Sequence, residues 1–206
     1  MMEMMGGIYN PHIKPGVFEL YCGPMKSGKT LQLIHRVDIL QYIQGCNFQF
    51  FKPALDTRTP DVSSRYGSRH TCIPINEKNP SEILERITSS TQSVALDEAQ
   101  FFQDDIDKVV QELVKRDINV IAAGLDLDFR GEPFGPMPRL LSIADLVYKT
   151  TGICEYNGCG APSTRTQRLV DGKPAPYDSP IIMIEDLKKE SYQCRCLRHH
   201  EVPGKP

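Results

Sequence analysis

Strand-like and helix-like apolar patterns alternate along residues 17–148 of the chain. Apolar runs of strand length occupy residues 17–22, 48–53, 93–96, 118–123 and 146–148. Between these runs, apolar residues three and four positions apart predict amphipathic helices within residues 33–44, 80–87, 106–113 and 140–144. Residues 54–80 are polar and predict mostly loop, with one short strand near residues 72–75. Strands that alternate with helices predict an α/β fold, in which a mostly parallel sheet has helices packed on its faces.

The pattern changes at about residue 150. Beyond Thr151 the chain is rich in Cys, Gly, Pro, Arg and Thr, and it has few apolar positions with a helical period. Four of the seven cysteines lie in this last quarter, together with two adjacent histidines. We therefore expect two domains, residues 1–150 and residues 151–206. The second is too small and too polar to be held together by hydrophobic burial alone.

Composition and charge exclude several classes of protein. The 206 residues carry 24 Lys and Arg against 26 Asp and Glu, and this net charge of −2 argues against a protein that coats nucleic acid. An odd count of seven cysteines, without a basic and apolar leader, argues against a disulfide scaffold and favours the reducing cytoplasm. No uncharged apolar run approaches the roughly 18 residues that a membrane helix needs. We therefore expect a cytoplasmic protein that binds neither a nucleic acid nor a membrane.

A phosphate-binding loop is predicted at residues 23–30. The segment GPMKSGKT matches the pattern G-x-x-x-x-G-K-[ST], and it lies between a predicted strand and a predicted helix. In such a loop the backbone N–H groups and the helix N-terminus bind a polyphosphate. We expect Lys29 to contact the β and γ phosphates and the Thr30 hydroxyl to bind Mg²⁺, while Lys26 stays a solvated cation. The alternative is a Gly/Ser-rich turn that fits the pattern without function.

Two carboxylates follow the apolar run at residues 93–96. In a phosphate-loop protein the carboxyl end of such a strand faces the nucleotide, and one carboxylate normally holds the metal ion. We expect Asp97 on the metal side, and Glu98, which points the other way by strand alternation, as a general base. The alternative is that both carboxylates only cap a helix that begins after Gln100.

The last quarter of the chain contains two pairs with the spacing of zinc ligands. Cys196 and His199 are separated by two residues, and Cys154 and Cys159 are separated by four. Four ligands from the two ends of a short segment would hold together a lobe that burial cannot stabilise, so we expect a structural Zn²⁺. Cys194 and His200 are the competing ligands, and thiols without a metal ion are the remaining alternative.

Several motifs together resemble the zinc-containing thymidine kinase family. They occur in the family's order over residues 17–204, and they are Gly23–Thr30, Asp56-Thr-Arg58, Asp97-Glu-Ala-Gln-Phe-Phe102, Gly124-Leu-Asp126 with Asp128-Phe129, Glu132-Pro-Phe134-Gly135 and the closing cysteine and histidine segment. The resemblance implies a phosphate-loop, recombinase-like parallel-sheet core with a small C-terminal zinc-binding lobe and lid. It implies transfer of the γ-phosphoryl group of ATP to the 5′-hydroxyl of thymidine, or of deoxyuridine, to give dTMP in pyrimidine salvage. It also implies Mg²⁺ with ATP, feedback inhibition by dTTP and a homotetramer.

The resemblance also assigns site residues. The residues that match the contacts to ATP and Mg²⁺ are Gly23, Pro24, Met25, Lys26, Ser27, Gly28, Lys29, Thr30, Asp56, Thr57, Arg58, Asp97, Glu98, Ala99 and Gln100. Glu98 matches the catalytic base, and Arg58 would neutralise charge on the transferring group. The walls around the nucleoside base match Phe101, Leu125, Phe129 and Phe134, and the flap over it matches Ile181, Ile182, Met183, Ile184, Glu185 and Tyr192.

Three features depart from the family pattern. The first cysteine pair has two extra residues, and His199 stands where many members have cysteine. In the flap, Ile184-Glu185-Asp186 replaces a glycine and a small residue, and two residues are added before Tyr192. These changes in the flap bear on nucleoside specificity more than on the phosphoryl chemistry.

Two other functions are weighed against this one. A nucleic-acid-dependent ATPase with a zinc lobe also has a phosphate loop and an Asp-Glu-Ala-Gln string, but it needs a second recombinase-like domain and a basic track. Neither fits 206 residues with a net charge of −2. A binding or regulatory module with an inactive nucleotide site is disfavoured because Lys29, Thr30, Asp97 and Glu98 are all present.

Overall fold

The computed structural model describes residues 16–40, 42, 47–56, 61–63, 69–103, 105–182 and 190–206, and all structural statements below concern these residues. Thr57, Arg58, Met183, Ile184 and Glu185, which the sequence assigns to the site, lie outside them.

A six-stranded sheet forms the centre of the fold. Its strands are β1 (Phe18–Cys22), β2 (Asn47–Pro53), β5 (Ile73–Ile75), β6 (Thr91–Leu96), β7 (Asn119–Gly124) and β8 (Leu146–Lys149). They lie in the order β5-β2-β6-β7-β1-β8, and every neighbouring pair is parallel. The predicted α/β class with a parallel sheet is therefore confirmed.

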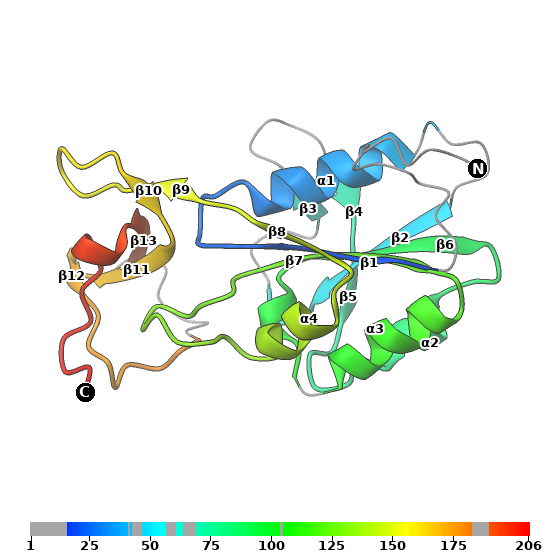
Figure 1. Cartoon of the computed structure of the whole chain (residues 1–206). Helices are drawn as coiled ribbons and strands as arrows, with labels where there is room; N and C mark the ends of the chain where they lie inside the picture. The colour runs from blue at the N-terminus through cyan, green and yellow to red at the C-terminus, as the bar shows by residue number, and fades with distance from the viewer. Residues whose placement is uncertain are drawn as a thin grey trace.

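Helices cover both faces of this sheet (Figure 1). They are α1 (Lys29–Leu40), α2 (Glu82–Arg86), α3 (Ile106–Lys115) and α4 (Met137–Ile143). Helix α1 packs on one face, and α2, α3 and α4 pack on the other (Figure 1). All four overlap stretches where the apolar spacing predicts helix, but α1 and α4 begin four and three residues earlier than predicted.

Strand alternation divides the apolar residues into two clusters. On β7, Val120 and Ala122 point into the larger cluster under α2, α3 and α4, whereas Ile121 and Ala123 point toward α1. Successive side chains of a strand point to opposite faces, so a strand with helices on both sides is apolar throughout. This burial explains why the central strands are continuous apolar runs in the sequence.

The prediction for residues 54–80 was incomplete. Within residues 54–80, predicted as mostly loop, an antiparallel pair forms from β3 (Asp61–Ser63) and β4 (Arg69–Thr71). The strand predicted near residues 72–75 is β5 at the edge of the main sheet. Strands β3 and β4 have three residues each and are largely polar, so they leave no apolar period that a sequence pattern could detect.

The chain after the main sheet forms a small lobe of short antiparallel strands. These are β9 (Gly152–Ile153) with β10 (Pro162–Ser163), and β11 (Arg165–Val170) between β12 (Lys173–Pro174) and β13 (Glu190–Arg195). A 3-10 turn, η2 (Leu197–His199), follows β13, and another, η1 (Ala99–Phe101), follows β6. The lobe and the C-terminus lie beyond the carboxyl end of β1 (Figure 1). None of the described helices has the length and apolar character to cross a membrane.

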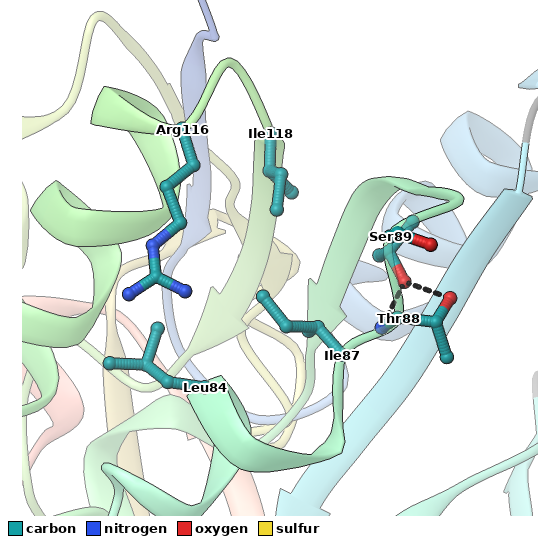
Figure 2. A pocket seen from close by; sticks show the side chains of 7 residues that line it. Leu84, Ile87, Thr88, Ser89, Arg116 and Ile118 are labelled. Atoms are coloured by element: carbon teal, nitrogen blue, oxygen red, sulfur yellow. Dashed lines mark hydrogen bonds between the residues drawn. The ribbon is translucent and has the colours of Figure 1, made fainter.

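A cavity of about 340 Å³ lies beside the amino ends of β6 and β7 (Figure 2). It is lined by Thr91, the first residue of β6, and by Ile118, which precedes β7, with Ile87 and Arg116 beside them. Strands β1, β6 and β7 are parallel, so this cavity is at the opposite edge from the loop that follows β1. It is therefore separate from the predicted nucleotide site.

Candidate functional site

The predicted phosphate loop connects β1 to α1. Two of its glycines have positive φ angles, 140° at Gly23 and 85° at Gly28, which an L side chain rarely adopts. A Cβ at Gly23 would lie 2.4 Å from the carbonyl oxygen of Thr150, so the loop start also packs too closely against the end of β8 for a side chain. The loop thus has the strand–turn–helix context that the motif requires.

The side chain of Lys29 folds back over the loop. Its Nζ donates to the carbonyl oxygen of Pro24 at 2.6 Å. Burial lowers the pKa of Lys29, while the nearby carboxylates of Glu98 and Asp97 act in the opposite direction. An ammonium group held in the loop beside two carboxylates is placed to meet the terminal phosphates of a nucleotide.

Asp97 lies directly opposite Thr30. The Thr30 hydroxyl donates to the Asp97 carboxylate, at 3.3 Å from Oδ2, and Asp97 is 7% exposed. Burial raises the pKa of Asp97 to about 7, and the neighbouring carboxylate of Glu98 adds to the rise. Oxygen ligands of this kind, a carboxylate beside the hydroxyl of a phosphate loop, suit Mg²⁺ with a nucleotide.

Glu98 and Gln100 form the turn after β6. Glu98 is in the left-handed region with φ 50°, and its side chain makes no capping hydrogen bond to η1. The Gln100 amide instead donates from Nε2 to Oε2 of Glu98 at 2.5 Å. The capping alternative therefore has no support from the geometry of Glu98.

Asp126 is a candidate that the sequence reading did not assign. It lies two residues after β7, whereas Asp97 directly follows β6, and it is 5% exposed. Lys149 Nζ lies 2.9 Å from its Oδ2. The negative charge of Asp126 also acts to raise the pKa of Lys29, against the lowering by burial. The signal for it was available, because Asp126, like Asp97, lies within two residues of the end of a buried strand.

The predicted walls of the nucleoside site gather only in part. The rings of Phe101 and Phe134 meet edge to face, with centroids 5.6 Å apart, and Leu125 is bound through its backbone to Gln100. Phe129 is buried, but its ring lies under the guanidinium of Arg168 at 5.3 Å, next to the small lobe. Leu125, Phe129 and Phe134 all come from the loop after β7.

Arg168 holds both ends of the predicted flap. It is 1% exposed, donates to the carbonyl oxygen of Pro180 at 2.5 Å and pairs with the carboxylate of Glu190. Pro180 precedes the predicted flap residues Ile181 and Ile182, which are both 41% exposed, and Glu190 lies two residues before Tyr192. Tyr192 lies on β13, and its hydroxyl donates to Glu190 at 3.5 Å.

Asp56, predicted to contact the nucleotide, pairs with Lys52. Their Oδ2 and Nζ atoms are 3.5 Å apart, and both side chains are largely buried at the end of β2. Strand β2 neighbours β6 in the sheet, so Asp56 follows the strand next to that of Asp97. Its carboxylate thus lies at the same edge of the sheet as the phosphate loop.

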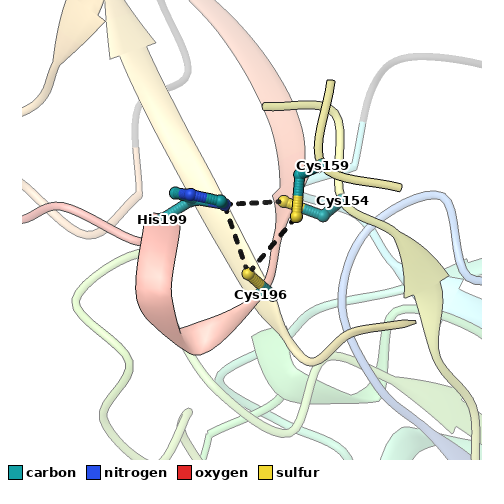
Figure 3. Close-up of side chains that lie close together, drawn as sticks. All are labelled: Cys154, Cys159, Cys196 and His199. Atoms are coloured by element: carbon teal, nitrogen blue, oxygen red, sulfur yellow. Dashed lines mark hydrogen bonds between the residues drawn. The ribbon is translucent and has the colours of Figure 1, made fainter. Parts of the chain in front are cut away.

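The four predicted zinc ligands come together in the small lobe (Figure 3). Nδ1 of His199 lies 3.4 Å from Sγ of Cys196 and 3.7 Å from Sγ of Cys154, and the sulfurs of Cys159 and Cys196 are 3.9 Å apart. A tetrahedral zinc with bonds of ~2.3 Å to sulfur and ~2.0 Å to nitrogen needs ligand atoms roughly 3.5–3.8 Å apart. The donor set and its spacing therefore fit a structural zinc ion.

The thiol chemistry is consistent with a metal site. Burial disfavours the thiolate of Cys154, but hydrogen bonds from the backbone of Cys196 and Tyr156 and the contact with His199 outweigh it and lower the pKa to about 6. The Tyr156 ring stacks on His199 at 4.1 Å, which fixes the plane of the imidazole. The described cysteines are free thiols, with no disulfide among them.

The two competing ligands have other partners. Cys194 is buried, which raises its pKa, and its thiol donates to the carbonyl oxygen of Met25 at 2.6 Å. Nε2 of His200 contacts the carbonyl oxygen of Phe129 at 2.8 Å. Neither belongs to the cluster of four side chains that could hold a metal ion.

The tip of the phosphate loop rests on the small lobe. Met25 N donates to Thr166 Oγ1 at 3.0 Å, and Lys26 Nζ pairs with Glu155 at 2.8 Å. The other oxygen of Glu155 accepts the N–H of Cys194 at 2.7 Å. Lys26 is thus a partly exposed cation, as expected, and in addition an ion-pair partner of the lobe, which was not predicted. The partner was not visible in the sequence because Glu155 is 129 residues away.

The chain matches a known protein-family model. The model described as thymidine kinase matches residues 16–200, which is most of the chain and spans both the sheet and the small lobe. Members of this family are phosphotransferases, in agreement with the phosphate loop, the acidic strand end and the metal cluster that could hold zinc. The chain belongs to the thymidine kinase family.

Proposed function

We propose that this protein transfers the γ-phosphoryl group of ATP to the 5′-hydroxyl of thymidine and releases dTMP and ADP. Deoxyuridine is the second acceptor to consider, because it differs from thymidine by one methyl group. The proposal rests above all on one observation: Lys29, Thr30 and Asp97 face one another at the end of β1 and β6, with Glu98 in the next turn. Membership of the thymidine kinase family supports the choice of acceptor.

The nucleotide would bind through the phosphate loop. Backbone N–H groups of residues 25–30, at the N-terminus of α1, would surround the phosphates, and the ammonium of Lys29 would neutralise the terminal ones. Thr30 and Asp97 would hold Mg²⁺ with ATP, since they supply a hydroxyl and a carboxylate within hydrogen-bond distance of each other. When bound, Mg²⁺ supplies charge neutralisation at the β and γ oxygens.

Glu98 would act as the base. As the 5′-oxygen of the nucleoside attacks the γ phosphorus, the carboxylate of Glu98 accepts the hydroxyl proton, and the bond from the γ phosphorus to the bridging oxygen breaks, so that ADP leaves. Arg58 would neutralise charge on the transferring group, as the resemblance implies. Phosphoryl transfer asks the protein mainly to position, neutralise and exclude water, and each of these residues serves one of those tasks.

The remaining parts of the proposal concern the lobe and the assembly. Residues 151–206 would form a zinc-stabilised lobe with the nucleoside flap, attached to the nucleotide-binding core of residues 1–150. Phe101, Leu125, Phe129 and Phe134 would contact the flat pyrimidine. A cytoplasmic homotetramer inhibited by dTTP completes the proposal, and neither a nucleic acid nor a membrane is a partner. The alternative of a nucleic-acid-dependent ATPase gains no support from the family match.

A nucleoside panel tests the reaction. We expect labelled phosphate from ATP to appear on thymidine, and more weakly on deoxyuridine, but not on deoxycytidine or deoxyguanosine. Glu98→Gln should bind ATP as the wild type does and lose about 10²–10⁴-fold in kcat, because the amide cannot accept the proton. The exposed Glu201→Gln, in the small lobe, is the matched control and should keep wild-type turnover. Stimulation of ADP release by DNA and not by thymidine would overturn the proposal, and near-normal turnover of Glu98→Gln would refute the base.

A further inference from the structure

Gln100 connects two segments that the proposed reaction uses separately. The side chain is 2% exposed, and its amide makes two hydrogen bonds in opposite directions. Nε2 donates to Oε2 of Glu98 at 2.5 Å, and Oε1 accepts the backbone N–H of Leu125 at 2.9 Å. A carboxylate can only accept and a backbone N–H can only donate, so these partners fix which end of the amide is nitrogen.

Close packing holds both the side chain and the backbone of Gln100 in place. A Cβ at Gly124 would lie 3.0 Å from Oε1 of Gln100, and a Cβ at Gly135 would lie 2.4 Å from the backbone carbonyl oxygen of Gln100. Gly135 also has φ +49°, in the left-handed region. The end of β7 and the loop that carries Phe134 are therefore packed against Gln100, and a small displacement of Gln100 would move both.

The Glu98 backbone is in a conformation that needs such support. A non-glycine residue with φ 50° is uncommon, and it persists where the surroundings hold it. The bond from Gln100 goes to Oε2 of Glu98 and so constrains the direction in which the carboxylate points. One side chain thus orients the carboxylate on one side and holds the nucleoside wall at Leu125 on the other.

We propose that Gln100 is a positioning residue that aligns Glu98 with the acceptor nucleoside. The resemblance places Gln100 among the residues for ATP and Mg²⁺, but its described hydrogen bonds go to Glu98 and Leu125. The inference rests on the proposed function, in which Glu98 is the base and Leu125 a wall of the nucleoside site. It assigns Gln100 no direct part in nucleotide binding. Loss of Gln100 should therefore change kcat and KM for the nucleoside and leave KM for ATP unchanged.

Steady-state kinetics of Gln100→Met test the separation. Methionine has a similar length but neither donates to Glu98 nor accepts from Leu125. We expect kcat to fall about 10²-fold, as for a misplaced catalytic group, and KM for the nucleoside to rise about 10-fold, with KM for ATP unchanged. Gln103→Met is the matched control, because Gln103 is exposed three residues further on, and it should keep wild-type constants.

A double-mutant cycle distinguishes positioning from a general structural effect. If Gln100 lowers the barrier through Glu98, then Gln100→Met should leave kcat of Glu98→Gln unchanged to within about 2-fold, while KM for the nucleoside still rises. An equal loss of kcat in both backgrounds would overturn the inference. So would wild-type constants in Gln100→Met, or a rise in KM for ATP that matches the rise for the nucleoside.

A second variant and a second measurement keep the inference testable if Gln100→Met does not fold. Gln100→Asn keeps the amide but is one methylene too short to reach both partners, and it should show the same separation of constants. Hydrogen exchange of the Leu125 amide should be slow in the wild type and faster in both variants. This readout does not depend on which nucleoside the enzyme phosphorylates. Wild-type protein that phosphorylates no nucleoside would refute the proposed function alone, whereas unchanged exchange at Leu125 would refute the bridge alone.

Discussion

The sheet domain and the small lobe are stabilised in different ways. Residues 18–149 bury two apolar clusters, one on each face of the sheet. In the lobe the buried side chains are largely thiols and polar groups, and they include Cys154, Ser163, Thr166, Gln167, Arg168, Cys194 and Cys196. A polar interior is stable only when each group finds a partner. The lobe thus depends on specific pairings, where the sheet domain depends on burial.

Three kinds of pairing hold the lobe together. The first is the cluster of four ligands that could hold zinc. The second is Gln167, whose side chain donates to the carbonyl oxygen of Glu201 and accepts its N–H, both at 2.8 Å. The third is the buried pair of Arg168 and Glu190. One substitution can remove the whole of such a directional contact, whereas it removes only part of the burial in an apolar core. The two regions should therefore respond differently to substitution.

Removing a zinc ligand should have the largest effect. In Cys154→Ser we expect zinc content to fall from one per chain to well below it, and amide protection in β11 and β13 to be lost. Structural zinc contributes about 10 kcal/mol or more to the folding of small zinc-dependent units, so the lobe should unfold while β6 and β7 keep slow exchange. Metal analysis and hydrogen exchange measure the two effects.

Cys194→Ser is the control for that substitution. It replaces the same atom in a neighbouring buried thiol that lies outside the cluster, and serine can still donate to Met25. We expect it to retain one zinc per chain. Full retention of zinc by Cys154→Ser, or its loss from Cys194→Ser, would contradict the ligand set.

In the sheet domain the corresponding weak point is a buried carboxyl group. Burial raises the pKa of Asp97 from 3.8 to about 7, so between these pH values the folded protein binds more protons than the unfolded chain. Stability must then fall as pH rises through this range and level off above pH 7. Relative to Asp97→Asn, we expect the nucleotide-free wild type to lose on the order of 2 kcal/mol between pH 5 and pH 8.

Urea unfolding at the two pH values measures this difference. Asp117→Asn is the matched control, because Asp117 is exposed at the end of α3 and should change nothing. If Asp97→Asn and the wild type had the same pH dependence, Asp97 would not be the buried proton-binding group. The same substitution should abolish most turnover, so the group that costs stability is one that the reaction needs.

The parts of the fold that were predicted from sequence are those with a local signal. Strand β7 is detectable as an apolar run because both its faces are buried. Helix α3 is detectable by its helical apolar spacing because one of its faces is buried. The strands β3 and β4 have three largely polar residues each and, in the described part of the chain, pair with each other and not with the main sheet, so no apolar period marks them. Short polar strands depend on tertiary contacts that a local pattern does not contain.

The same distinction applies to the candidate site. The phosphate loop and the cysteine pairs are contiguous motifs. The structure places the loop between a strand and a helix and brings the four predicted zinc ligands together, as the motifs implied. The bridge from Gln100 to Leu125 and the bond from Arg168 to Pro180 join different segments of the chain. These contacts depend on how separate segments pack against one another, which no motif encodes. Sequence reasoning predicted candidate ligands and phosphate contacts, and it did not predict the hydrogen bonds that Gln100 and Arg168 make between segments.

The contact between the two regions should show the smallest effect. Lys26 and Glu155 pair across it, with 30% and 37% of their side chains exposed. Exposed ion pairs contribute about 0–1 kcal/mol and are screened by salt, so Glu155→Gln should lower the free energy of unfolding by less than about 1 kcal/mol, and high salt should remove the difference. The glutamine can still accept the N–H of Cys194, and Glu201→Gln makes the same charge change at an exposed site in the lobe without a partner on the loop. A larger loss that persists in high salt would mean that the loop and the lobe unfold as one unit, and the division between a buried core and a pairwise-held lobe would then be wrong.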